Sequence, residues 1–552
     1  MQDVDDGSTP GNRVAETPAI DPNAPVPGYS WYALTVLVVV YVLNFVDRQI
    51  LSILANDIKA DLGVDDAYLG FLYGTAFAIF YALFGIPLGR LADSWKRVRL
   101  MTLGLTLWSA MTVISGLARD AATLTLARVG VGVGEASASP SAYSLISDWF
   151  PARIRATALA IYSSGIYIGG GISLLIGGLI VDSWNGAYPD GGPFDLAGWQ
   201  VAFIAVGLPG LLLACWVITL REPVRGAIDG IPTQEDPHPF RGFVQELMTV
   251  IPPFTIIGAA RRGIAALILN LAVLSGLFAL GVALTVYLGS GQGKIMGSMT
   301  DAIQMTDQWL FLAVGYYAVF CWATALRRRD APTFALTWGS PAFICTILGY
   351  GTVAFMAYAA SYWTAPYAER VFEISKSALG LWIGAPSAVA GFLGVIGGGR
   401  MADFLVTRFE AGRIFVVLFG LLTPIPLLYW QFTTDDLTTF LILAFFSGML
   451  ASSALGAAAA TSQALVLPRM RGAATATFFL ATTLIGLALG PFLAGYVSAQ
   501  NDGDLSQGML ATLWIAPIGF LCLLGALKMV PAANRTLLAR ATAAGEPGLT
   551  TA

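Results

Sequence analysis

Charged side chains are scarce in this sequence: Asp, Glu, Lys and Arg make up 12% of its 552 residues, whereas soluble domains carry about a quarter. It has one histidine, His238, and four cysteines, each within an apolar run and without paired spacing: Cys215, Cys321, Cys345 and Cys522. These patterns favour neither disulfides nor a metal site, and no GxxxxGK[ST] loop is present. A lone histidine in a polar linker also offers no nucleophile and base for catalysis. We therefore expect no enzyme, cofactor, metal ion or nucleic acid partner.

Hydrophobic residues, in contrast, make up 56% of the chain, in runs of about 20 residues separated by short polar gaps. The runs do not alternate between apolar and polar residues, which excludes a β-barrel. This pattern predicts an all-α polytopic membrane protein. The first 28 residues are acidic and rich in proline, with no apolar signal segment, so we expect a disordered tail over 1–29.

The apolar runs predict fourteen crossings, arranged as two sets of six with an inserted pair. The first set lies near 31–55, 67–90, 100–117, 121–146, 156–181 and 200–220. The second set lies near 340–366, 379–402, 414–430, 437–466, 473–497 and 509–530. The expected domains are a six-helix bundle over 30–221, a linker over 222–338 with a hairpin at 263–288 and 308–326, a second bundle over 339–530 and a tail over 531–552.

Lys and Arg residues in the gaps predict the orientation. If the N-terminus is cytoplasmic, the opposite side holds few basic residues: Lys59, Arg119, Lys294, Arg370 and Lys376. This asymmetry requires both inserted runs to cross, and it places both termini in the cytoplasm. Because the inserted pair contains no interior charge and lies between the two sets, we expect it to lie outside the twelve-helix core, away from the substrate path.

The two sets of six are a repeat. Residues 68–93, YLGFLYGTAFAIFYALFGIPLGRLAD, align without gaps with 378–403, ALGLWIGAPSAVAGFLGVIGGGRMAD. The alignment matches Gly70 with Gly380, and Asp93 with Asp403. Repeats of six helices that start on the same side are typical of transporters whose halves rock about a central site.

Four charged residues lie inside the predicted helices: Asp47 and Arg48 on the first, and Arg128 and Glu135 on the fourth. A charge at mid-membrane costs at least about 2.5 kcal/mol, which favours a functional site over a static ion-pair lock between two helices. At 1.5 Å per residue, Asp47 and Arg128 share the outer third of the membrane, and Glu135 lies about 10 Å deeper. Our hypothesis is that Arg128 exchanges between Asp47 and Glu135, and that the carboxylate it leaves takes up a proton.

Arg48 points away from Asp47 and is expected to bind an anionic head group or to close an outer gate. Asn44, Tyr358 and Tyr362 are candidates for cavity lining, although an interfacial belt is an equally good interpretation of the tyrosines.

Asp93 and Asp403 end equivalent helices of the repeat, where each could meet a helix N-terminus of the opposite half. With Arg97 they form a predicted cytoplasmic gate latch. The alternative is that both are ordinary solvated loop charges.

The segment GRLADSWKRVR (89–99) resembles the loop motif of the major facilitator superfamily, departing from it at Ser94 and Lys96. Within that superfamily, NFVDRQI on the first helix, RVGVGVGEASASP (128–140) on the fourth and LREPVRG (220–226) are similar to the spinster family. The resemblance implies a major facilitator fold in a bacterial cell membrane, and proton-coupled export of amphiphiles such as lysophospholipids, sphingolipids or drugs. It also implies that Asp47, Arg48, Arg128 and Glu135 are the working charges. A proton symporter for organic anions is the alternative. We expect the partners to be protons, membrane lipid and the substrate, and a functional monomer.

Overall fold

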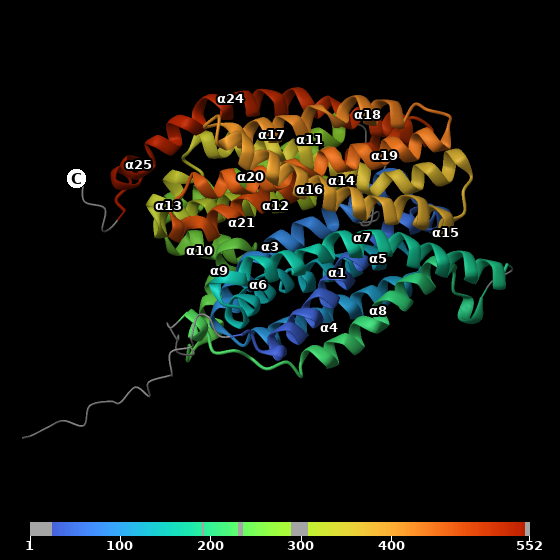
Figure 1. Ribbon diagram of the computed structural model, residues 1–552, viewed down its shortest axis with the longest axis horizontal. Helices are drawn as coiled ribbons and strands as arrows, with labels where there is room; N and C mark the ends of the chain where they lie inside the picture. Colours follow the sequence, from blue (N-terminus) through green and yellow to red (C-terminus); the bar gives the residue numbers. More distant parts are fainter. Residues whose placement is uncertain (1–24, 190–191, 230–235, 289–306, 547–552) are drawn as a thin grey trace, which may run out of the picture.

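The computed structural model describes residues 25–189, 192–229, 236–288 and 307–546, and these residues form helices and connecting turns, without strands. Most of the predicted N-terminal tail lies outside the described residues. Two helical bundles lie one above the other in Figure 1, with their helices nearly parallel to its long axis. We call the end where α1 begins, at Gly28, the tail end, and the end where α1 finishes, at Leu62, the far end.

The first bundle contains helices α1 to α8. Their bounds are α1 Gly28–Leu62, α2 Asp66–Tyr73, α3 Thr75–Ser94, α4 Arg97–Gly116, α5 Ala121–Glu135, α6 Ala138–Trp149, α7 Ala152–Ala187 and α8 Gly198–Val217. In lipid each backbone N–H must find its partner within its own segment, and the long apolar runs do so as helices.

The second bundle contains helices α14 to α24 and repeats this order. Their bounds are α14 Pro341–Phe372, α15 Lys376–Leu379, α16 Ala385–Val406, α17 Gly412–Leu422, α18 Pro424–Gln431, α19 Leu437–Ser452, α20 Ala454–Ala464, α21 Arg471–Ala481, α22 Gly490–Gln500, α23 Leu505–Thr512 and α24 Ala516–Arg535. Two π-helical turns interrupt it, η3 Gly380–Gly384 before α16 and η5 Thr482–Leu487 before α22. The C-terminal segment continues into α25, Leu537–Ala543.

Thirteen helical segments of the described chain are long and apolar enough to cross a membrane, or fourteen if α9 and α10 are counted as one bent span. The α5 and α6 pair is not among the thirteen. It packs on α3 and α4 inside the first bundle, however, and so supplies the fourth crossing of that bundle. With it the chain has the predicted fold: two six-helix repeats and an inserted hairpin.

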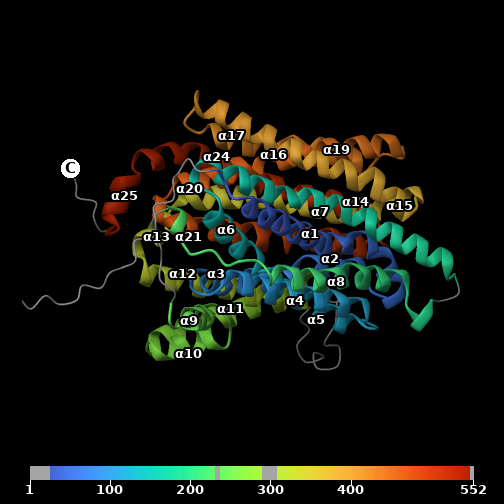
Figure 2. The same cartoon turned by 60° about the horizontal axis from the view of Figure 1, so that its bottom comes forward.

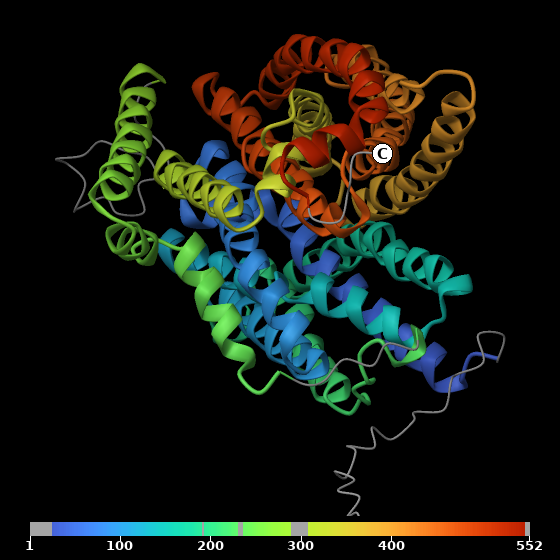
Figure 3. The same ribbon diagram turned by 90° about the vertical axis from the view of Figure 1, so that its left-hand side faces the viewer.

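The linker forms α9 Pro239–Val250, α10 Phe254–Arg261, the hairpin helices α11 Ile264–Leu288 and α12 Asp307–Arg329, and the short α13 Ala331–Leu336. Only 11% of the apolar window of α11 is buried, so this helix is peripheral, as expected. α12 is less peripheral, because 44% of its apolar window is buried and it packs against both bundles. Seen from the tail end, α12 lies at the seam between the bundles, and α11 lies farther out (Figure 3).

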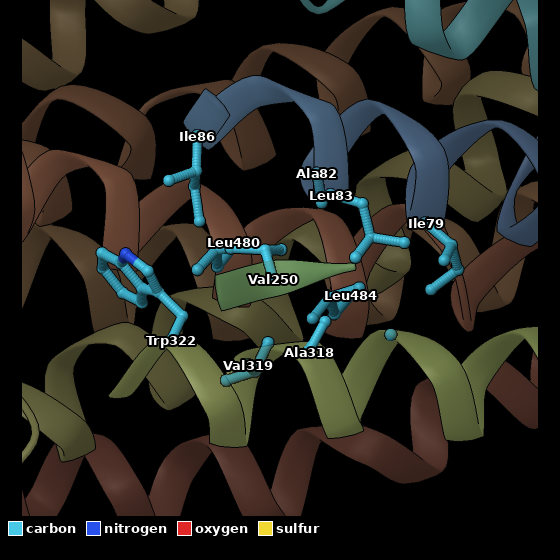
Figure 4. Close-up of a pocket in the computed structure, with 11 residues that line it drawn as sticks. Ile79, Ala82, Leu83, Ile86, Val250, Ala318, Val319, Trp322, Leu480 and Leu484 are labelled. Carbon is cyan, nitrogen blue, oxygen red and sulfur yellow. The ribbon is translucent and has the colours of Figure 1, made fainter. Parts of the chain in front are cut away.

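Contacts of α12 reach both bundles. On the first bundle, the Phe311 ring packs edge-on against Phe71 and Phe80. On the second, the Trp309 ring packs against Phe492, and the Tyr316 hydroxyl donates to the Leu484 carbonyl at 3.4 Å. A small apolar cavity remains between α3, α9, α12 and the α21–η5 segment, with Ile79, Val250, Trp322 and Leu484 in its lining (Figure 4).

The glycines of the repeat allow the bundles to approach closely. A Cβ on Gly74 would lie 2.5 Å from the Leu487 carbonyl oxygen in η5, and a Cβ on Gly384 would lie 2.5 Å from the Gly171 carbonyl oxygen in α7. Gly70 lies one turn before Gly74 and meets α22, which follows η5. Gly380 lies one turn before Gly384 and meets α7. The residue pairs that align in the repeat therefore make equivalent crossings in the fold, where small residues let two helix backbones come together.

Candidate functional site

The four interior charges lie together in the first bundle, on α1 and α5. The Asp120 side chain caps the N-terminus of α5 by accepting from the Thr123 N–H at 2.8 Å. Gly132 and Gly134 place α5 against α3 and α4, because a Cβ at either glycine would meet backbone atoms of those helices. The glycines of the GVGVGEAS segment thus serve close packing, and they bring Arg128 and Glu135 beside α1.

Glu135 forms an ion pair with Arg48. Arg48 Nη2 lies 2.6 Å from Glu135 Oε2, and the side chains are 10% and 0% exposed. The Arg48 guanidinium also lies 4.5 to 5.1 Å from the ring centroids of Phe45, Phe77 and Tyr81. These rings offer their negative faces to the cation, so Arg48 is held in place even without a second carboxylate.

Our hypothesis has Arg128 exchanging between Asp47 and Glu135, whereas in this conformation Arg48 forms the ion pair with Glu135. The cause is the length of α1, which has 35 residues and extends well beyond a bilayer. Measured from the far end at 1.5 Å per residue, Arg48 and Glu135 both lie about 21 Å deep, so their side chains can meet. Counting from the start of α1 instead places its charges too high.

Asp47 and Arg128 are both fully buried and incompletely paired. Arg128 Nη1 donates to the main-chain carbonyl of Asp47 at 3.3 Å, not to its carboxylate. Within the described part of the chain, neither carboxylate oxygen of Asp47 has a hydrogen-bond partner. The Nε and Nη2 atoms of Arg128 also have none there. A buried charge without a partner is expensive, so these two groups are candidates for a change of charge or of partner.

The predicted cavity-lining residues lie close to the contact between the bundles. Tyr362 is fully buried and stacks on Tyr73 of α2, with ring centroids 4.3 Å apart. Tyr358 is half-buried one turn before it on α14. Asn44 is buried one turn before Arg48, and its amide nitrogen lacks a partner among the described residues. These positions match a gate between bundles better than an interfacial aromatic belt.

Gln49, which the sequence analysis did not select, links α1 to both neighbours. Its amide nitrogen donates to the Ser361 carbonyl of α14 at 2.8 Å, and its amide oxygen accepts from the Tyr73 hydroxyl at 3.0 Å. The sequence does mark Gln49 as a polar residue inside an apolar helix, directly after Arg48, but an uncharged amide is less conspicuous than a charge.

Polar contacts join the bundles at the far end. Arg370 of α14 binds Asp66 of α2 through two nitrogens, at 2.7 and 2.8 Å. Lys376 of α15 lies 2.9 Å from Asp57 of α1. Ser52 donates to the Tyr362 carbonyl at 2.5 Å. From the sequence, Arg370 and Lys376 are expected only as loop charges. Residues of a cross-bundle network look the same in sequence as charges at solvated helix ends.

At the tail end, no hydrogen bond or ion pair joins the two bundles directly among the described residues. Asp93 and Asp403 are both exposed there. Arg97, predicted to join Asp93, is instead fully buried and binds Asp148 and Glu222 of its own half, the latter at 2.8 Å. Glu222 also accepts from the main-chain N–H of Arg97, so it caps α4, while the Arg97 charge still acts on the nearby Asp93 carboxylate.

The comparisons agree with this architecture. The model of the Major Facilitator Superfamily matches residues 37–365. The chain belongs to the major facilitator superfamily. This major facilitator protein is 25% identical over 501 residues to an MFS-type efflux pump of Mycolicibacterium smegmatis, with 91% of this chain and 92% of the pump covered.

Two further matches place the chain with the spinster family. A crystal structure of a bacterial homologue of the human lysosomal transporter Spinster, inward-facing and unoccupied, matches with a TM-score of 0.64 and 26% identity, covering 94% of this chain and 99% of that chain. Drosophila melanogaster protein spinster is 27% identical over 220 residues, which is 39% of this chain and 34% of that protein. The protein is therefore a multi-pass membrane transporter of this family and not an enzyme.

The ion pair leads to a stability prediction. Arg48→Gln should lower the melting temperature of the detergent-solubilised protein, because it leaves the Glu135 carboxylate buried without a counter-charge, a loss of about 3 kcal/mol or more. The double variant Arg48→Gln with Glu135→Gln removes both charges and should recover most of that loss. A double variant as unstable as Arg48→Gln would mean that Arg48 stabilises the fold through the aromatic rings alone.

Proposed function

We propose that this transporter exports amphiphilic small molecules by proton-coupled alternating access, with Glu135 and Asp47 as proton carriers. The observation that carries the proposal is the unequal pairing of two fully buried carboxylates. Glu135 is held by Arg48, whereas among the described residues neither oxygen of the Asp47 carboxylate has a hydrogen bond, and the nearby Arg128 binds only the Asp47 main-chain carbonyl. A proton can therefore replace Arg48 on Glu135, and binding of that proton releases Arg48. The similarity to an efflux pump and to spinster proteins supports an amphiphilic substrate.

The conformation fits one state of this cycle. We take the tail end to be cytoplasmic, since it holds most of the basic loop residues, and the protein to lie in the bacterial cell membrane as a functional monomer. Polar contacts then join the bundles on the outside, and none joins them on the inside among the described residues, as expected for an inward-facing state. Arg48, Asn44, Tyr358 and Tyr362 lie below the outer contacts and would meet a substrate entering from the cytoplasm.

A proton symporter for organic anions is the second candidate, favoured by the partly exposed Arg48 guanidinium. The probable galactarate/D-glucarate transporter GudP of Bacillus subtilis is 30% identical over 200 residues, covering 35% of this chain and 41% of that protein. The two functions require opposite protonation states of Glu135 when the substrate binds. An exported cation or zwitterion binds after Glu135 has released its proton, whereas an anion binds to Arg48 when Glu135 is protonated.

Reconstituted vesicles with an imposed pH gradient test both candidates. A panel of lysophospholipids, cationic drugs and sugar acids is offered, and proton movement is followed with an internal pH dye. Export that consumes the gradient by antiport supports the proposal. Uptake of a sugar acid together with protons supports symport, and transport that is independent of the gradient contradicts both.

The tail end gives a separate prediction. Asp93→Asn should shift the population further toward the inward-facing state, because Asp93 is exposed here and can serve as a latch only when the tail ends close. Labelling of single cysteines on the facing surfaces of the two bundles measures the shift. Glu410→Gln is the matched control, since Glu410 pairs with Arg535 of its own bundle at the same end. Equal labelling of Asp93→Asn and the unsubstituted protein would contradict the latch.

A further inference from the structure

A basic hollow lies at the tail end, where the linker meets the first bundle and the hairpin. It has a volume of about 660 Å³ and is lined by Arg90, Gly242, Gln245, Glu246, Met248 and Arg329. These residues come from the end of α3, from α9 and from the last turn of α12. The hollow is thus built by three elements that meet only because the hairpin packs against the first bundle.

Two arginines and two carboxylates lie at the hollow. Arg329 binds Glu246 and also donates to the Thr249 hydroxyl at 3.1 Å. The Arg90 guanidinium is exposed and forms no hydrogen bond or ion pair among the described residues, although the Asp93 carboxylate one turn away lies within electrostatic range of it. Asp93 is shared with Arg97 and Arg225, so the N–H donors of Arg90 remain free for a ligand.

The surrounding elements add more positive charge. Five further arginines lie on α9, at the end of α10 and in the last turn of α12: Arg241, Arg261, Arg262, Arg327 and Arg328. Glu246 is the sole acidic residue of α9 and α10, and the nearby Asp330 is already bound by Arg469 at 2.7 Å. Burial, and then the adjacent Arg328 charge, lower the pKa of Arg262, which places two of these like charges close together.

The position of the hollow favours a ligand from the membrane surface. α9 and α10 bend by 91° and lie along the edge of the molecule beside α11 (Figure 2). They expose large apolar side chains beside the arginines, namely Phe240, Val244, Phe254 and Ile257. Exposed apolar residues next to basic ones are typical of a helix that lies in the headgroup region of an anionic leaflet.

The apolar contacts continue from the hollow into the membrane. Val250 of α9 and Trp322 of α12 line the apolar cavity two turns or less from Glu246 and Arg329. That cavity holds only about 10 Å³, room for one small group, so acyl chains would lie on the outer face of α9 to α11 and not between the bundles. A polar head in the hollow with its chains on that face has the orientation of a leaflet lipid.

We propose that this hollow binds the phosphate headgroup of an anionic phospholipid, with Arg90 and Arg329 as its ligands. Arginine suits this role because its guanidinium donates two parallel hydrogen bonds to phosphate oxygens. The bound lipid would join α3 to α12 and so attach the hairpin to the first bundle. This site is separate from the Arg48–Glu135 pair and does not depend on the proposed transport reaction.

Lipid binding to the full-length protein in detergent tests the proposal. Phosphatidylglycerol, phosphatidylcholine and the soluble headgroup glycerol phosphate are titrated separately, and binding is followed by the melting temperature and by lipid retention in native mass spectrometry. We expect phosphatidylglycerol alone to raise the melting temperature. Arg90→Gln should weaken its binding about tenfold, the effect of one charged hydrogen bond. Arg90 loses no hydrogen bond or ion pair among the described residues, and glutamine keeps part of the stem that packs against Gly242, so this variant should fold normally.

Arg535→Gln is the matched control, since Arg535 is an exposed arginine at the same end on the second bundle. It should bind phosphatidylglycerol like the unsubstituted protein. Equal stabilisation by glycerol phosphate would identify a free-anion site instead. Equal lipid binding by Arg90→Gln, or equal loss in Arg535→Gln, would overturn the assignment to this hollow.

Discussion

Glu135→Gln should abolish the accumulation of substrate against a gradient and leave exchange without a driving force largely intact. A glutamine is permanently neutral and therefore imitates only the protonated carboxyl, so the variant cannot take up and release the coupled proton. Arg48 loses its counter-charge, but it keeps three aromatic rings and is still 10% exposed, so we expect the fold to survive. Driven uptake and counterflow in the same vesicles measure the two activities.

The matched control for this variant is Glu410→Gln, a change of the same kind at an exposed surface pair. It should transport like the unsubstituted protein. If Glu135→Gln still concentrates substrate, Glu135 does not carry the proton, and Asp47→Asn becomes the next test of the pair. If it loses exchange as well as driven transport, Glu135 is needed for substrate binding or for the conformational change itself.

Gly74→Val and Gly384→Val should each hold the transporter open at the far end and remove most transport. At both positions the new Cβ would lie 2.5 Å from a carbonyl oxygen of the opposite bundle, so the closed crossing cannot form. The conformation with the far end open separates these helices and tolerates the side chain. Distances between spin labels on the far ends of α2 and α22, and of α7 and α16, measure the opening.

The same helices offer controls in which the side chain meets nothing. A Cβ at Gly85 of α3 or at Gly397 of α16 has no atom within 4 Å. Gly85→Val and Gly397→Val should keep the distances and transport of the unsubstituted protein. If Gly384→Val keeps the far end closed, the crossing of α7 and α16 can shift, and it is not the contact that limits closure.

Much of the fold could be predicted because lipid restricts the structures that are possible. Apolar runs of about 20 residues must be helices there, and the repeat of 68–93 in 378–403 requires two bundles of the same design. The position of α12 could not be predicted, since a helix side that faces lipid and one that faces protein are equally apolar. A phenylalanine such as Phe311 is equally compatible with lipid and with a protein interface.

The members of the site were easier to predict than their pairing. Asp47, Arg48, Arg128 and Glu135 are conspicuous because charges are rare in apolar helices. Which arginine reaches Glu135 depends on where each helix starts relative to the membrane, and α1 is much longer than one crossing. Arg97 likewise pairs with Asp148 and Glu222, which lie 51 and 125 residues away in sequence, and no local pattern marks these contacts.

The position of α12 between the two bundles has a pharmacological consequence. Its aromatic side chains touch both bundles, so at least one of these contacts must slide or separate each time the transporter changes conformation. The cavity beside Trp322 and Leu484 holds only about 10 Å³, so a small apolar compound could bind there only by moving α12 away from its neighbours, and it would then disturb contacts with both bundles and stop turnover without occupying the substrate path. Such an inhibitor would lower the maximal rate at every substrate concentration, and excess substrate would not displace it.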